Sequence, residues 1–550
     1  MRQLLGSAEA RQGGAEPSAS RCGSGRRRIL GRVLFGNAGA DDPRGHRGNA
    51  RAAPAPCRDK ANCRAWRMLI GQASINLFAN ILSALLGLLS VFIFTRLFSP
   101  HDYGIYLLGV GFASVVSTFL AGWFRNLILS RHARNDGSDV RGLVLSGYLV
   151  CCLTAPAAYE LGRLVGLDAI AAVAAVLLAV AVGLFELTQD LVRARLRAIT
   201  AMKATLVRAV SAVCLGVSVA IFAPHGFLLL VSSALACLLA VLVQSRAAWR
   251  GTIVKFDGAG LLAAAKQGLP LTLSLTLLAI SSVTDRFVIA NLIGSADTGR
   301  YIAGLDLVRQ TLMMPAMSVA AAFFPLAIKI HANQGRAAVR SHLGECVELL
   351  LSITLPACLG FAVISLHIAN VVLGADFREM AAQTMPILAV AVIFQILTQQ
   401  YLHASFLLSG RNSFYLINTA SIIAANVILS YAFVSQYGTM GAAWARLGAD
   451  VLGFFCALIL SRRAFPIPMP PGRLALTMIA GLIMALTVIT IDTSLHVSDL
   501  VACIVLVGAG LVSYLAACWL FDISYTRRRL NVCLAFFRTR FANIGTGSAT

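Results

Sequence analysis

The chain alternates between long apolar runs and short polar segments. Most apolar runs have roughly 18 to 26 residues, the length at which an α-helix crosses about 30 Å of hydrocarbon. None of the segments between them exceeds about 25 residues. The pattern predicts an all-α integral membrane protein with about fourteen transmembrane helices. The predicted spans are residues 70–94, 104–124, 142–162, 166–187, 205–223, 226–244, 268–293, 304–328, 346–373, 384–408, 413–434, 438–460, 474–491 and 499–521.

Two of the polar segments carry the same pattern 195 residues apart. The first copy consists of Asp102, Gly104, Tyr106 and Gly109, and the second of Asp297, Gly299, Tyr301 and Gly304. Such a repeat predicts two six-helix bundles, over residues 68–265 and 266–465, around a central cavity. Six is an even number, so the bundles enter the membrane from the same side as parallel repeats. Residues 466–523 then form a peripheral helix pair, and Gly104 and Gly299 are predicted hinges between cavity-lining helices.

Composition and charge agree with a membrane location. Hydrophobic residues make up 58% of the chain, charged residues only 13%, and the mean hydropathy is +0.77, which excludes a water-soluble globule of this size. Loops after even-numbered spans hold nineteen basic residues and loops after odd-numbered spans hold four. The positive-inside rule therefore places both termini in the cytoplasm. The formal net charge of +22 is explained by this topology, and no nucleic-acid partner is expected.

The two ends of the chain differ from the rest. Residues 1–67 contain fourteen basic and five acidic residues without an apolar run, which is typical of a disordered tail. Met68 stands directly before the first span, so a start assigned too far upstream is one explanation. A basic arm that is attracted to anionic headgroups is the other. Residues 524–550 are predicted to form a basic cytoplasmic tail.

Signatures of catalysis and metal binding are missing from the sequence. The thirteen cysteines have no zinc-ligand spacing, and most lie singly within apolar runs. Nucleotide-binding, nucleophile-elbow and zinc-protease motifs do not occur. We therefore expect neither an enzyme nor a metal or other cofactor.

A few charged side chains are expected at membrane depth, where charge is costly and usually functional. They are Asp285 and Arg286 in the seventh span, Asp306 and Arg309 in the eighth, and Arg446 and Asp450 in the twelfth. Asp306 and Arg309 share a helix face, as do Arg446 and Asp450. Each pair either lines a polar cavity or neutralises itself and holds helices together. The cavity role is favoured for the four residues of the seventh and eighth spans.

Several polar residues are weaker candidates for the cavity. Asn76 and Asn80 share one face of the first span, and Gln399 lies within the tenth; sugar contact and helix–helix hydrogen bonding both fit these amides. Arg125 ends the second span, where it either meets an arriving anion or anchors the helix at the cytoplasmic face. Glu186 and Asp190 close the fourth span and are expected to pair with nearby Arg193.

Short motifs follow one another in a fixed order along the predicted spans. They are Thr95-Arg96-Leu97-Phe98-Ser99-Pro100, Asp102-Tyr103-Gly104, Asp285, Gly299-Arg300-Tyr301, Pro325, Leu355-Pro356, Gly374, Phe377, Ser409-Gly410-Arg411, Gly438 and Gly441-Ala442-Ala443. In these motifs and their order, residues 70–465 resemble the polysaccharide transport branch of the superfamily that contains multidrug exporters and oligosaccharide-lipid flippases.

The resemblance implies a flippase for lipid-linked oligosaccharides in the bacterial cytoplasmic (inner) membrane. Its cargo would be a polyprenyl-diphosphate glycan, moved by alternating access through a cavity lined by spans one, two, seven and eight. Implied partners are this cargo, membrane lipids, and the polymerase and export machinery of the same pathway. An ion-coupled exporter of cationic amphiphiles, a membrane glycan ligase or polymerase, and a scaffold without transport are the alternatives.

Overall fold

A computed structural model describes residues 82–133, 141–195, 197–252 and 256–523, and the regular structure in these ranges is helical. The predicted tails and the candidates Asn76 and Asn80 lie outside them. The helices are Leu82–Leu97, α4 (Pro100–Ala133), α5 (Arg141–Cys152), α6 (Ala155–Leu164), α7 (Ala169–Ala194), α8 (Ala198–Phe222), α9 (Gly226–Trp249), α10 (Gly258–Ile293), α11 (Ser295–Val363), α12 (Ser365–Val372), α13 (Ala375–Ile396), the π-helical turn η1 (Leu397–Leu402), α14 (His403–Leu408), α15 (Asn412–Ala464), α16 (Pro471–Asp492) and α17 (Asp499–Phe521).

The described helices confirm the prediction of an all-α membrane protein. Ten of them are long and apolar enough to span a bilayer, or eleven if α5 and α6 count as one bent span. Two of the ten are interrupted by a glycine with positive φ, at Gly335 in α11 and at Gly438 in α15. Because the chain changes direction at these glycines, each of the two long helices contains two of the predicted spans.

Two predicted spans are less regular than expected. The third is split into α5 and α6, which meet at 47°. Pro156 lies at the start of α6, where its ring is incompatible with a helix that continues from Cys152. The tenth is interrupted by η1, a wider turn of a kind that often occurs at functional sites.

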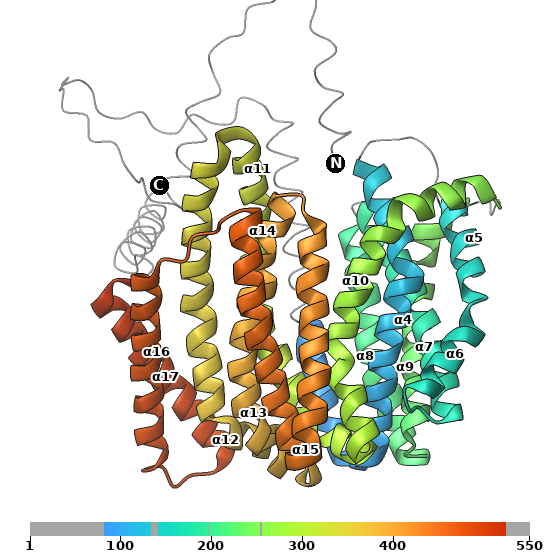
Figure 1. The fold of residues 1–550 in the computed structure, drawn as a ribbon. Helices are drawn as coiled ribbons and strands as arrows, with labels where there is room; N and C mark the ends of the chain where they lie inside the picture. Colours follow the sequence, from blue (N-terminus) through green and yellow to red (C-terminus); the bar gives the residue numbers. More distant parts are fainter. Residues whose placement is uncertain (1–81, 134–140, 196, 253–255, 524–550) are drawn as a thin grey trace, which may run out of the picture. The chain divides into compact units, whose positions relative to one another are not determined.

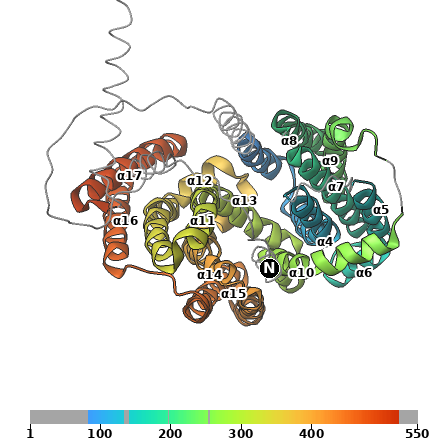
Figure 2. The ribbon, with the colours of Figure 1, turned by 90° about the horizontal axis from the view of Figure 1, so that it is seen from above.

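Apolar side chains form a separate core in each half of the molecule. One core lies among α4, α5, α7 and α9, and another among α11, α13 and α15. The ribbon shows the two groups of helices next to each other, with α10 close to α4 (Figures 1 and 2). The second core also includes Phe94, Phe98 and Tyr103 from the first half, so the halves share apolar packing.

Helices α16 and α17 pack on one another outside the two groups, over a small core of their own (Figure 1). Their connection is joined to α12 by His367, whose Nδ1 lies 2.7 Å from Asp499 Oδ1 and whose Nε2 lies 2.9 Å from Asp492 Oδ1. Both ring nitrogens face carboxylates, which requires two N–H donors and therefore favours the imidazolium. Burial lowers the pKa of His367, but the two hydrogen bonds outweigh it and raise the pKa above its usual value.

We expect this clamp to weaken as pH rises. A raised pKa stabilises the folded state fully below the ordinary histidine pKa of about 6.5, and the contribution is lost as pH rises through the raised value. Hydrogen exchange of the α16–α17 connection should therefore be slower in the unmodified protein than in His367→Gln at pH 6. The difference should shrink by pH 9. An equal difference at both pH values would show that the charge of His367 has no part in the clamp.

The repeated glycines meet at the start of α4 and α11. A Cβ atom on Gly104 would overlap the carbonyl oxygen of Ser295, and one on Gly299 would overlap that of Pro100. Pro100 and Ser295 are themselves repeat equivalents, so the contact is symmetric: each helix places its glycine against the first turn of the other. This close approach joins the two halves at one end of the bundle. The hinge role of the two glycines stays a prediction.

The repeated aspartates differ from each other in their contacts. Ser99 caps α4 by accepting from the Asp102 amide at 3.1 Å, and Asp102 Oδ1 accepts from Gly226 at the start of α9 at 3.0 Å. Asp297 instead accepts from Arg300 Nη1 at 2.7 Å. Neither aspartate therefore caps the helix in whose first turn it lies, because the donors to their carboxylates are the Gly226 amide of α9 and the side chains of Ser99 and Arg300.

Replacing Gly104 with alanine should destabilise the protein, because the added methyl meets backbone, which cannot rotate away. We expect a loss of about 1 to 3 kcal/mol, the usual cost of overpacking. Gly508→Ala is the matched control, since nothing lies within 4 Å of a Cβ at Gly508 in α17. Thermal unfolding of the two purified variants measures the difference. Equal stability of Gly104→Ala and Gly508→Ala would mean that α4 and α11 can move apart without loss of stability.

Candidate functional site

Helix α10 lies between the two halves and carries the most deeply placed charges. It packs on α4 of the first half and on α15 of the second. Glycines allow the close approach to α4: a Cβ on Gly268 would lie 2.9 Å from Trp123 Cβ, and one on Gly122 would lie 2.9 Å from Thr272 Cγ2. The boundary expected between residues 265 and 266 falls inside this helix, so α10 belongs structurally to both sides of the seam.

Arg286 connects three helices at the seam. Its Nη2 lies 2.5 Å from Asp306 Oδ1 of α11, and its Nη1 donates to the Leu107 carbonyl of α4 at 3.4 Å. The Arg286 side chain is 9% exposed and that of Asp306 21%, so the pair is sheltered but accessible. Asp306 lies about 17 Å along α11 from its first residue, just within the eighth predicted span.

Asp285, the neighbour of Arg286, points into the second half of the molecule. It is completely buried, and its Oδ2 lies 3.4 Å from Arg446 Nη1 of α15. Arg446 Nε also lies 2.8 Å from Asp450 Oδ2. One guanidinium therefore links two buried carboxylates on two helices. For Arg446 and Asp450 this is the mutual neutralisation that the sequence allowed as one alternative.

Arg309 belongs to the same region but is not ion-paired with a carboxylate among the described residues. Its Nη1 donates to the Ser282 carbonyl at 3.1 Å. With the Gln395 amide oriented to face the guanidinium groups, Gln395 Oε1 accepts from Arg309 at 3.0 Å, from Arg446 at 3.1 Å and from Gln399 at 3.2 Å. Gln399 lies in η1, so the irregular turn brings a second amide to the cluster.

We call this set of residues the seam cluster: Asp285, Arg286, Asp306, Arg309, Gln395, Gln399, Arg446 and Asp450. It holds three guanidinium groups and three carboxylates, so its formal charges cancel. Arg309 contacts only neutral acceptors. Arg286 is paired with one carboxylate, that of Asp306, and this pair is partly accessible to solvent. These two arginines are therefore the groups able to meet an anion, since an arginine fork suits phosphate oxygens and keeps its charge.

Arg125 forms a different cluster within the first half. Its Nη1 lies 2.6 Å from Glu186 Oε2 and its Nε lies 2.7 Å from Asp190 Oδ2. The expected pairing of the two acids with Arg193 was therefore wrong. Glu186 and Asp190 are four residues apart and face α4, whereas Arg193 is exposed. Arg125 is fixed by these carboxylates, and no contact between it and the seam cluster is seen.

The connection from Asp285 to Arg446 did not emerge from the sequence. The link between Asp285 and Arg446 joins residues 161 apart. Neither the order of the spans nor the repeat predicts it.

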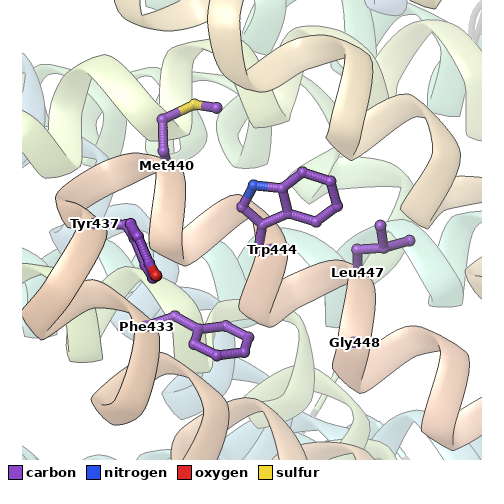
Figure 3. Close-up of a pocket in the computed structure, with 6 residues that line it drawn as sticks. All are labelled: Phe433, Tyr437, Met440, Trp444, Leu447 and Gly448. Carbon is purple, nitrogen blue, oxygen red and sulfur yellow. The ribbon is translucent and has the colours of Figure 1, made fainter.

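An apolar cavity, apart from the seam cluster, opens on α15 around the break at Gly438. It has a volume of about 660 Å³ and is lined by Phe433, Tyr437, Met440, Trp444, Leu447 and Gly448 (Figure 3). Trp444 is half exposed there, whereas Arg446 and Asp450 on the same helix are buried. The lining carries no charged side chain, so this face of α15 suits hydrocarbon. The described residues also contain no group of three or more His, Cys, Asp or Glu side chains placed to hold a metal ion.

Comparisons with known proteins agree with this architecture. A family model described as polysaccharide biosynthesis protein matches residues 93–382. A solved structure of the lipid II flippase MurJ in an inward closed conformation is similar, with a TM-score of 0.68 and 15% identity over 81% of this chain and 98% of that one. An inward-facing multidrug resistance MATE transporter of the MOP superfamily has a TM-score of 0.56 and 16% identity over 71% of this chain and 97% of that one. No curated protein matches significantly.

Proposed function

Because the chain belongs to the family of polysaccharide biosynthesis proteins, we propose that it is a flippase for a polyprenyl-diphosphate oligosaccharide in a bacterial cytoplasmic membrane. The seam cluster carries this proposal. Its Arg286 and Arg309 belong to the seventh and eighth predicted spans, where a diphosphate would have to be screened from hydrocarbon, and Arg286 also contacts α4 of the first half.

In this proposal the diphosphate competes with protein acceptors for the arginines. Arg286 exchanges Asp306 for phosphate oxygens, and Arg309 exchanges Ser282 and Gln395. Gln399 and the amides Asn76 and Asn80 of the first span would hydrogen-bond sugar hydroxyls. The polyprenyl chain stays in the bilayer. Arg125 is held by two acids and would act at the cytoplasmic approach to the cavity.

Transport would proceed by alternating access. The Gly104–Gly299 contact closes one end of the seam, and the two halves would rock about it. Breaking the Arg286–Asp306 pair upon cargo binding would loosen α10 from α11, since this pair joins the two helices. The nineteen basic residues of the even-numbered loops orient the other end and both termini toward the cytoplasm.

A deletion strain tests the proposal in cells. Loss of the protein should remove the surface glycan while its lipid-linked precursor accumulates on the cytoplasmic side. Restoration by the unmodified gene, with the enzymes that build the precursor intact, provides the control. Precursor that still reaches the outer leaflet at normal levels in the deletion strain would contradict a flippase role.

The likeness to a multidrug transporter fold supports a second candidate, an ion-coupled exporter of cationic amphiphiles. Such a cargo requires carboxylates that are free to meet a cation. Here Asp285, Asp306 and Asp450 are each ion-paired with an arginine, which disfavours this function. Increased sensitivity of the deletion strain to cationic dyes, with normal surface glycan, would favour it. A glycan ligase or polymerase would instead leave unpolymerised precursor in the outer leaflet.

A further inference from the structure

A cavity at the last turn of α9 lies apart from the seam cluster. It has a volume of about 580 Å³ and is lined by Ser245, Arg246, Trp249 and Arg250. Ser245 and Trp249 are four residues apart, as are Arg246 and Arg250, so neighbouring positions of one helix end form the wall. Both arginines are exposed, and neither is ion-paired with a carboxylate of the described residues.

Two other arginine side chains donate hydrogen bonds to the backbone around this cavity. Arg195 Nη1 donates to the Ala247 carbonyl at 2.7 Å, and Arg141 Nη1 donates to the Arg250 carbonyl at 2.9 Å. The end of a helix normally carries a partial negative charge on its free carbonyls, which repels anions. Here these two arginines satisfy carbonyls at the helix end, so the guanidinium groups of Arg246 and Arg250 can act on an anion in the cavity.

The cavity also lies at the right depth for a lipid headgroup. Helix α9 has 24 residues and is therefore about 36 Å long, which exceeds the roughly 30 Å of the hydrocarbon layer. Its last turn consequently reaches the headgroup region on the side of the arginine-rich loops. Trp249 is typical of that region, and its indole is fixed by donating to Thr188 Oγ1 at 3.2 Å.

The second half of the chain has a corresponding helix end, but the aromatic side chain there has different surroundings. Ser461, Arg462 and Phe465 repeat the spacing of Ser245, Arg246 and Trp249 at the end of α15. Phe465 is buried, with Arg336 5.9 Å above its ring and His331 5.6 Å away. In the second copy the aromatic side chain is thus covered by groups of the protein itself, whereas in the first copy Trp249 lines a cavity.

We propose that the α9 cavity binds the phosphate of an anionic phospholipid headgroup from the membrane leaflet at that end. Arg246 and Arg250 donate to the phosphate oxygens in the manner of an arginine fork. Trp249 covers the glycerol region of the lipid, and Ser245 lines the floor. The inference concerns a resident lipid and does not depend on the cargo of the seam cluster.

Native mass spectrometry of the purified full chain with phosphatidylglycerol tests the proposal. The variant Arg246→Gln/Arg250→Gln should bind this lipid about 30-fold more weakly, because each basic residue at a membrane surface contributes about fivefold. The control Arg462→Gln/Arg463→Gln removes the same charge from the corresponding helix end and should change binding less than threefold. Unchanged thermal unfolding would show that both variants are folded.

Two further ligands separate the possible sources of the phosphate. Phosphatidylcholine with the same acyl chains carries its phosphate beside a quaternary ammonium, so its binding should fall less than that of phosphatidylglycerol in Arg246→Gln/Arg250→Gln. Inorganic phosphate should fail to displace phosphatidylglycerol at equal concentration. An equal loss of phosphatidylglycerol binding in Arg246→Gln/Arg250→Gln and in Arg462→Gln/Arg463→Gln would overturn the proposal, since the loss would then reflect general surface charge. Displacement by inorganic phosphate would overturn it as well, by assigning the cavity to free anions.

Discussion

Arg286→Gln is expected to lower translocation of the lipid-linked glycan about 100-fold. A pair of charge-assisted hydrogen bonds from one guanidinium to a diphosphate is worth roughly 3 kcal/mol, and glutamine retains little of it. Arg286→Lys keeps the charge but loses the fork of donors, so its translocation rate should lie between those of the unmodified protein and of Arg286→Gln. Initial rates of translocation in proteoliposomes, normalised to the amount of folded protein, measure the effect.

The double variant Arg286→Gln/Asp306→Asn separates cargo binding from ion pairing. It removes both charges of the pair and so leaves no unpaired carboxylate at the seam. If Arg286 binds the diphosphate, the double variant stays as slow as Arg286→Gln although it regains stability. Recovery of the full rate would contradict the binding role and would reduce Arg286 to a partner for Asp306.

Arg446→Met is expected to have the largest effect on stability. Arg446 neutralises Asp285 and Asp450, which are 0% and 4% exposed, and methionine would leave both carboxylates buried without a cation. Removing one partner of a buried ion pair costs about 3 to 5 kcal/mol. We therefore expect poor yield of folded protein and a much lower unfolding temperature in detergent.

The triple variant Asp285→Asn/Arg446→Met/Asp450→Asn is the matched control. It removes the two carboxylates together with the guanidinium, so no uncompensated charge remains, and most of the stability should return. If the triple variant unfolds as early as Arg446→Met, packing around the Arg446 side chain, and not its charge, would be what stabilises this part of the bundle.

The fold could be predicted from the sequence because its determinants are local. A helix that crosses a bilayer needs a long apolar run, and such runs remain visible even where two spans follow each other with only a break between them, as in α11 and α15. The break at Gly335 falls between two predicted spans, and the break at Gly438 falls on the first residue of the twelfth. The bend at Pro156 was missed because its apolar surroundings suggested one uninterrupted span.

The candidate site could be predicted only as a set of residue types at membrane depth. Which charged side chains pair with one another depends on how each helix is rotated about its axis, because successive residues of a helix differ in direction by about 100°. Asp285 and Arg286 are adjacent in sequence, yet the first is bound by α15 and the second by α11. Helix α10 is covered on both sides, so its apolar pattern contains no stripe from which this rotation could be deduced.

The repeat was informative about the seam for a geometric reason. Glycine at both repeat positions is required because each helix places backbone against the other at Gly104 and Gly299. The charges are not repeated in this way: Arg286 and Asp285 have no charged counterparts in the described part of the first helix. The contact between the halves is therefore symmetric, whereas all side chains of the seam cluster come from the second half.

Translocation in proteoliposomes tests the central claim most directly. The purified full chain is reconstituted with a fluorescent polyprenyl-diphosphate oligosaccharide, and the fraction that becomes accessible to a membrane-impermeant glycan-modifying enzyme is followed over time. We predict protein-dependent transfer across the bilayer that falls about 100-fold in Arg286→Gln. Transfer no faster than in protein-free vesicles, by protein that is folded, would contradict the account.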